Sequence, residues 1–224
     1  MGALLTSTCL RTGLLLLVAA GPGCRHCREE TVTPNLAPPY DGWFRGRAGS
    51  ANPTVAATTA AGLTDSYPNT TTVGGTYPDP LSYNCTQYHS ESRNLNYAAA
   101  LYGYSFRISV VQYHEGPLLL VSDYSRGNPA TTWLRYHLST GKAEPIRYSN
   151  MPAGVVPDSL KPDVRQLPSL TVNGYTYAPV WRLTNPYLAS RGAPSSAAVL
   201  YLSPEYGLVR FEQRDGTVWN LEGR

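Results

Sequence analysis

The stretch Ala197–Leu221, AAVLYLSPEYGLVRFEQRDGTVWNL, decides the fold class of this chain. It contains three short runs rich in apolar residues, separated by the turn sequences SPEYG and RDG. Short runs divided by Gly, Pro and Asp are typical of consecutive antiparallel strands. The pattern therefore predicts a three-stranded meander at this end of the chain.

A second strand signal lies just before this meander, in Leu170–Leu183, LTVNGYTYAPVWRL. Asn173 and Gly174 stand between Val172 and Tyr175, and an Asn-Gly pair favours the two-residue type I′ turn, in which both residues have positive φ. We therefore expect a tight β-hairpin centred on Asn173-Gly174.

Strand-like segments continue back to about Leu81, and together they predict an all-β, mainly antiparallel domain over residues 81–224. We expect a curved sheet, a half-barrel or a sandwich. Residues 149–169 contain four prolines and are expected to form a long loop, while Ser90–Leu101 could hold a short helix with Ser90 as its N-cap.

The N-terminal part has the features of a targeting signal. Residues 1–23 contain one charge, Arg11, and a short apolar core over residues 14–20, which predicts a secretory signal peptide. Cys24 follows Gly23 at the end of this segment, as in a bacterial lipobox, and is the expected lipidation site. The alternatives are a plain cleaved signal and a metal or redox site at Cys24 and Cys27.

Residues 24–80 are rich in Pro, Thr, Gly and Ala, and we expect a lipid-anchored, low-complexity, disordered tether there. Trp43 and Phe44 are the exception, because two large aromatic residues either dock on the domain or begin an edge strand. Cys27 and Cys85 could pair in an oxidising compartment, or Cys85 could be a free buried thiol.

The charge pattern counts against a nucleic-acid partner. The formal net charge is +3, Lys142 and Lys161 are the only lysines, and there is no run of basic residues. Nucleic-acid binding usually needs a basic stripe. The expected contact with a membrane is through the lipid anchor.

Enzyme motifs are missing, so we expect no cofactor and no metal, and an activity is not the favoured interpretation. His89, His114 and His137 lie in the domain and could converge in space, which leaves an unrecognised hydrolase open. Asp158 and Asp163 form a carboxylate pair in the expected loop, but their spacing does not argue for shared chemistry.

Aromatic residues are the remaining functional clue, and the candidate ligand-binding residues are Tyr175, Tyr177, Trp181 and Trp133. Strand alternation would put Tyr175, Tyr177 and Trp181 on one face in a row, and Trp133 on the face opposite to Tyr136. Such a row suits a glycan or a peptide. It equally suits packing against residues 149–169.

The C-terminal part resembles secreted Bacteroidetes lipoproteins of unknown function, in which an NG-containing strand precedes Y-x-S-P-x-Y-G-L-V-R-F and a final D-G-x-x-W. The matching positions are Asn173, Gly174, Tyr177, Val180, Tyr201, Ser203, Pro204, Tyr206 to Phe211, Asp215, Gly216 and Trp219. The resemblance covers roughly residues 170–221. It implies a periplasmic or surface-exposed β-rich domain on the bacterial outer membrane, similar to the half-barrels of lipoprotein carriers.

Two function classes follow besides catalysis. The first is a binding or structural module of the cell envelope, and the second is a carrier that holds an apolar ligand in a half-barrel. A carrier should line its concave face with aliphatic side chains, whereas a glycan or peptide binder should expose Tyr and Trp.

The lipid anchor is tested by labelling with a fatty acid in a bacterial host. The wild-type protein should take up the label and fractionate with membranes. Cys24→Ser should abolish the label and release the protein, because no other residue carries the lipid. Equal labelling of the two proteins would contradict the anchor.

Overall fold

The computed structural model describes residues 30–32, 35–45, 54–78, 86–98, 101–113, 115–125, 132–144 and 161–222. Almost every element in these ranges is a β-strand. The elements are β1 (Glu30–Val32), η1 (Tyr40–Gly42), β2 (Thr54–Thr59), β3 (Thr64–Pro78), β4 (Thr86–Ala98), β5 (Ser105–Tyr113), β6 (Gly116–Asp123), β7 (Thr132–His137), β8 (Lys142–Ala143), β9 (Asp163–Leu167), β10 (Leu170–Val172), β11 (Tyr175–Tyr177), β12 (Val180–Thr184), α1 (Pro186–Arg191), β13 (Ala197–Ser203), β14 (Gly207–Gln213) and β15 (Val218–Leu221).

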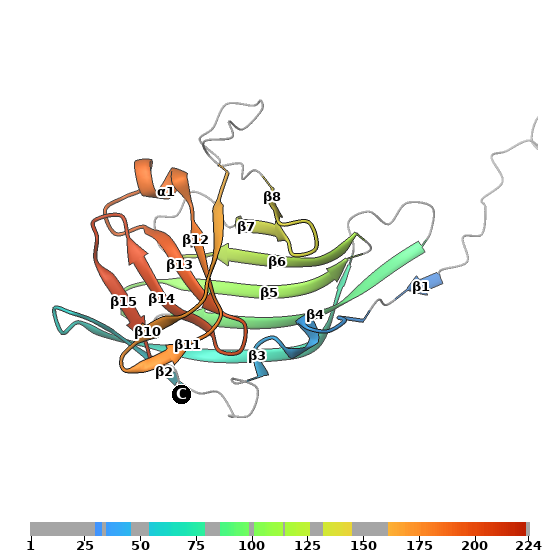
Figure 1. The fold of residues 1–224 in the computed structure, drawn as a ribbon, viewed down its shortest axis with the longest axis horizontal. Helices are drawn as coiled ribbons and strands as arrows, with labels where there is room; N and C mark the ends of the chain where they lie inside the picture. The colour runs from blue at the N-terminus through green and yellow to red at the C-terminus, as the bar shows by residue number, and fades with distance from the viewer. Residues whose placement is uncertain are drawn as a thin grey trace, which may run out of the picture.

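One large curved sheet contains most of these strands (Figure 1). Its order is β8-β7-β6-β5-β4-β3-β2-β15-β14-β13-β12-β9, with β1 parallel to β4 and all other pairs antiparallel. The sheet is open, with β8 and β9 at the two ends of this order. The expected all-β, antiparallel class with a curved sheet is therefore confirmed.

The sheet has two halves that meet in β3. Residues Thr64–Pro68 of β3 pair with β2, and residues Asn69–Pro78 pair with β4. We call β3 to β8 the long-strand half, and β2, β9 and β12 to β15 the C-terminal half. Figure 1 shows the strands of the two halves running in crossing directions. A strand that changes sheets in this way forms the corner of an orthogonal packing.

Aromatic rings fill the space between the two halves. Phe106 of β5 lies 5.4 Å from Phe211 of β14, measured between ring centroids, and Phe211 stacks on Trp219 of β15 at 5.9 Å. Tyr104, just before β5, lies 5.0 Å from Phe211. Each such pair is worth about 0.5–1.5 kcal/mol beyond the area that it buries. The contacts of Phe106 and Tyr104 with Phe211 therefore join segments that are more than one hundred positions apart in the sequence.

The Tyr104 hydroxyl is part of the same junction. It donates to the carbonyl oxygen of Ser195 at 2.8 Å, and it accepts from the Gln213 side chain. Burial raises the pKa of Tyr104 to about 12, and the negative charges of Asp215 and Asp123 add to the rise. The hydroxyl therefore stays protonated and able to donate at neutral pH.

Tyr97 of β4 makes a second link between the halves. Its side chain is fully buried, and its hydroxyl accepts from the backbone N–H of Leu208 at 3.0 Å. The preceding residue, Gly207, has φ +77°, and an added Cβ would overlap both the Tyr97 hydroxyl and the Leu95 side chain. Glycine is therefore favoured at position 207 for two reasons: it adopts the left-handed backbone conformation, and it leaves room for the side chains of Tyr97 and Leu95.

Helix α1 closes part of the core. Asn185 is its N-cap, with Oδ1 accepting from the N–H groups of Tyr187 at 3.1 Å and Leu188 at 3.3 Å. Pro186 occupies the first turn, where its missing N–H costs nothing. The side chains of Tyr187 and Leu188 are buried in the central core.

The two local predictions near the C-terminus are confirmed. β13, β14 and β15 form the expected meander. Asn173 and Gly174 have φ +49° and +81°, and Val172 pairs with Tyr175 across the turn.

The structure corrects two expectations about the chain before residue 170 and decides one point that was open. The domain does not begin near Leu81, because β2 and β3 of the expected tether lie inside the sheet, between β15 and β4. Both strands are rich in threonine, whose branched side chain favours strands even where apolar residues are few. The short helix considered for residues 90–101 is largely strand β4, and the end of the expected loop 149–169 is strand β9.

Gly207 and Gly174 both have positive φ, but the contact with Tyr97 predicts that replacing Gly207 by alanine lowers the free energy of unfolding more than replacing Gly174. Gly207→Ala should lower the free energy of unfolding by about 2–5 kcal/mol, through backbone strain and overlap with Tyr97. Gly174→Ala should cost only about 1–2 kcal/mol, since nothing lies within 4 Å of the added Cβ. Denaturant unfolding of both variants measures this, and equal losses would contradict the close approach at Gly207.

A candidate ligand cleft around Trp181

The segment of residues 35–45 forms one wall of the candidate site. The Leu36 N–H donates to the carboxylate of Glu91 in β4 at 2.8 Å, and the Phe44 N–H donates to the carbonyl oxygen of Pro204 in the β13–β14 turn. Leu36, Trp43 and Phe44 are buried in the central core. The segment therefore bridges the long-strand half and the C-terminal half of the sheet.

Phe44 holds the C-terminal end of the segment of residues 35–45 against the core. Its φ is +63°, in the left-handed region that bulky residues rarely adopt. The side chain is only 1% exposed, so its burial offsets the backbone strain. Trp43 and Phe44 can both reach the core as a result, and their rings meet edge to face at 5.8 Å.

A cleft of about 370 Å³ opens between this wall and the C-terminal half of the sheet. This volume lies in the range of small-ligand sites. The lining residues are three aromatic rings, three prolines and three other residues: Tyr40, Trp43, Trp181, Pro39, Pro179, Pro204, Gly42, Gln166 and Glu205. We call this site the Trp181 cleft.

The rings of Tyr40, Trp43 and Trp181 are arranged along a curve. The ring centroids of Tyr40 and Trp43 are 6.3 Å apart with the planes tilted by 48°, and those of Trp43 and Trp181 are 6.3 Å apart with a tilt of 47°. Trp43 is 5% exposed and forms the floor, whereas Tyr40 and Trp181 are half-buried. Rings arranged along a curve surround a compact ligand group better than they stack on a flat one.

Tyr136 from β7 packs against Trp181 and supports its ring. The two rings meet at 5.6 Å and 67°, an edge-to-face geometry. Burial raises the pKa of Tyr136, and the neighbouring Tyr40 adds to the rise. The contact joins β7 and β12, which stand near opposite ends of the strand order, so the curvature of the sheet assembles the cleft.

Glu205 supplies the negative charge of the cleft. It is exposed in the β13–β14 turn and is the one acidic residue of the lining. Within the described residues, no cation forms an ion pair with Glu205. Asp41, beside the cleft, is paired with Arg45 at 3.0 Å.

Strand β9 places an edge of the sheet beside the cleft. Gln166 of β9 is the cross-strand partner of Trp181, so both side chains lie on the same face. β9 ends the strand order, and in the described part of the chain it pairs on one side only, with β12. An extended chain could therefore pair with β9 and direct a side chain towards the cleft.

The expected row of Tyr175, Tyr177 and Trp181 does not form. Tyr175 and Tyr177 lie in the two-stranded β10–β11 sheet, and Trp181 lies in the large sheet. Tyr177 is 3% exposed and packs against Tyr206 at 5.6 Å, in a cluster separate from the core that contacts Trp181. The alternation is interrupted because β11 ends before Ala178-Pro179, and proline cannot donate to a ladder.

Of the four candidate residues, the structure puts only Trp181 in the cleft. Tyr175 is 45% exposed away from it, and Tyr177 is structural. Trp133 is 1% exposed and belongs to the central core. It shares that core with Leu134 and Tyr136, contrary to simple alternation, because a register irregularity between Val121 and Ser122 leaves Trp133 as an extra residue in β7.

Docking on the domain and an edge strand were both open for Trp43 and Phe44, and the structure shows docking, with Trp43 buried in the core and lining the site. Pro39, Pro204, Gln166 and Glu205 were missed. Their only sequence signal is nearness to Trp43, to the turn SPEYG and to residues 149–169, and none of these says that they meet in space.

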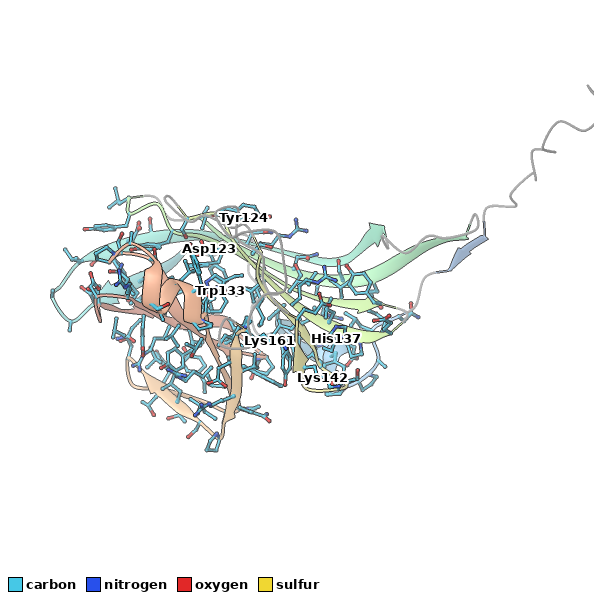
Figure 2. The ribbon with its side chains drawn as sticks, turned by 90° about the horizontal axis from the view of Figure 1, so that it is seen from above. Asp123, Tyr124, Trp133, His137, Lys142 and Lys161 are labelled. Atoms are coloured by element: carbon cyan, nitrogen blue, oxygen red, sulfur yellow. The ribbon has the colours of Figure 1, made fainter. Side chains whose placement is uncertain are left out.

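The possible catalytic residues do not assemble at the cleft. His137 of β7 bonds to Glu144 at 2.9 Å, and Glu144 also pairs with Arg135 at 2.7 Å. Figure 2 shows His137 beside Lys142, its partner on β8. The other residues singled out lie outside the described residues or have no described side chain: Cys24, Cys27, Cys85, His89, His114 and Asp158.

The described residues hold neither a metal-binding cluster nor a membrane-spanning helix. They contain no group of three or more His, Cys, Asp or Glu side chains that could hold a metal ion. They also contain no helix that is long and apolar enough to cross a bilayer. No known protein family, curated protein or solved structure matches this chain.

Phe44 should hold the N-terminal wall in place. Phe44→Ala should lower the free energy of unfolding by about 3–5 kcal/mol, the usual cost of removing a buried phenylalanine ring. Hydrogen–deuterium exchange of residues 35–45 should also become faster. The matched control, Tyr175→Ala, removes an exposed ring and should change stability by less than about 0.5 kcal/mol; similar losses in both variants would mean that the wall is not docked.

Proposed function

We propose that this protein is an envelope-anchored binding module that takes an extended peptide beside strand β9 and receives one of its side chains in the Trp181 cleft. The anchor is lipid on Cys24, at the outer membrane, as the signal-like N-terminus and the resemblance to Bacteroidetes lipoproteins suggest. The observation that carries the proposal is an aromatic cleft directly beside a sheet edge.

Strand addition uses the two features together. A peptide paired with a sheet edge gains affinity from main-chain hydrogen bonds, and pockets for alternate side chains give specificity. The peptide residue opposite Gln166 would project from the same face as Gln166 and Trp181. Its Cβ would lie about 4.5–5.5 Å from that of Gln166, within reach of the cleft.

A peptide fits the wall better than a glycan stacked on a flat platform. The rings of Tyr40, Trp43 and Trp181 are tilted by nearly 50° from one to the next, so they do not form a flat row. The three prolines of the lining add apolar surface that a side chain can cover.

The carrier alternative has less support. The interior of the curved sheet is filled by packed aromatic side chains, including Tyr97, Phe106, Phe211 and Trp219, all of which are at most 1% exposed. A carrier would need room for its ligand there, lined with aliphatic groups. A hydrolase also has less support, since the lining of the Trp181 cleft contains one carboxylate and no His, Ser or Cys.

Peptide and glycan arrays test the proposal. The wild-type protein should bind a subset of peptides, Trp181→Ala should lose that binding, and Tyr175→Ala should keep it. Methylation of the peptide amides that face β9 should abolish binding, whereas methylation of the alternate amides should be tolerated, because only every second residue bonds to a given neighbour. Undiminished binding by Trp181→Ala, or binding to glycans alone, would overturn the proposal.

A further inference from the structure

The charge and shape of the Trp181 cleft indicate which side chain it accepts. Three aromatic rings line the cleft, tilted by nearly 50° from one to the next, and the one carboxylate of its lining is that of Glu205. We propose that the cleft selects an alkylammonium group, such as that of a lysine side chain. This inference rests on the proposed function and names the chemistry of the group that enters the cleft.

The aromatic rings favour a cation through their electrostatic quadrupole. The face of an aromatic ring is negative, and an ammonium group within about 6 Å of the ring centroid is attracted to it, most strongly for tryptophan. Trp43 and Trp181 are 6.3 Å apart, and Tyr40 is 6.3 Å from Trp43. These separations allow a compact cation in the cleft to lie within about 6 Å of more than one ring centroid.

Glu205 adds a charge of the complementary sign. It has no cationic partner among the described residues, whereas the neighbouring carboxylate of Asp41 is neutralised by Arg45. An anionic ligand would meet one net negative charge and no donor cation in the lining. The attraction should be moderate and weakened by salt, because Glu205 is exposed.

The prolines explain why a long alkyl stem should fit. Pro39, Pro179 and Pro204 cover the cleft walls with apolar surface that carries no donor group. Lysine buries its methylene stem against such surface while its ammonium group remains near polar partners. The lining thus matches both ends of the side chain, with the prolines for the stem, and the rings and Glu205 for the head.

The test compares n-butylammonium, which mimics the lysine side chain, with n-butanol, a neutral molecule of the same chain length. Binding is followed by the four indole N–H signals in nuclear magnetic resonance spectra of the ¹⁵N-labelled protein. The signals of Trp43 and Trp181 should move, while those of Trp133 and Trp219 should not, since the latter are 1% exposed in the core. Tryptophan-to-phenylalanine variants assign the signals.

Butylammonium should bind about two- to fivefold more tightly than butanol, the factor expected for a cation–π contact at an exposed site. Glu205→Gln should weaken butylammonium binding and leave butanol binding unchanged. Glu115→Gln, in the β5–β6 turn and outside the cleft lining, should alter neither. Raising the salt concentration should weaken the binding of butylammonium and leave the binding of butanol unchanged.

The outcomes separate this inference from the proposed function. Equal binding of the two probes at Trp43 and Trp181, or no effect of Glu205→Gln, would overturn cation selection and leave peptide binding intact. Array peptides that need Trp181 but lack any preference for lysine would overturn it as well. Undiminished array binding by Trp181→Ala would instead overturn the peptide site itself.

Discussion

The contact between Phe106 of β5 and Phe211 of β14 is the constraint on which the structure depends. Phe106 and Phe211 meet from strands at opposite parts of one sheet, and they can do so only if the sheet bends on itself in β3. The bend lets a single sheet supply both layers of its own core. Everything else that brings distant segments together, including the Trp181 cleft, follows from that curvature.

The cleft is a by-product of how the open side of this sheet is filled. Residues 35–45 insert their aromatic side chains into the core, and Tyr136 reaches across from β7 to support Trp181. The part of this aromatic group that stays accessible then lies beside the edge strand β9. Burial of most of the group gives the site rigidity, and partial exposure of Tyr40 and Trp181 gives it a surface on which a ligand can bind.

Several residues that attract attention in the sequence serve stability instead. Trp133 is placed in the core by the irregularity of β7, and Tyr177 packs on Tyr206 on the other side of the C-terminal half. Strand alternation predicts a face only while a strand continues without interruption. Both errors arose where a bulge or a proline interrupted the strand.

The sequence by itself determined the β class, the C-terminal meander and the Asn173-Gly174 turn, because these depend on strand and turn chemistry within a few residues. It singled out Trp43 and Phe44 as unusual in their segment without deciding between docking and an edge strand, and it named Trp181 together with three residues that do not line the cleft. Only the tertiary structure decided that threonine-rich β2 pairs with β15, and that Tyr40, Trp181 and Glu205 line one cleft. The β2–β15 pairing and the approach of Tyr40 to Trp181 each join segments more than one hundred positions apart, and they depend on the curvature of the whole sheet, which no local pattern encodes.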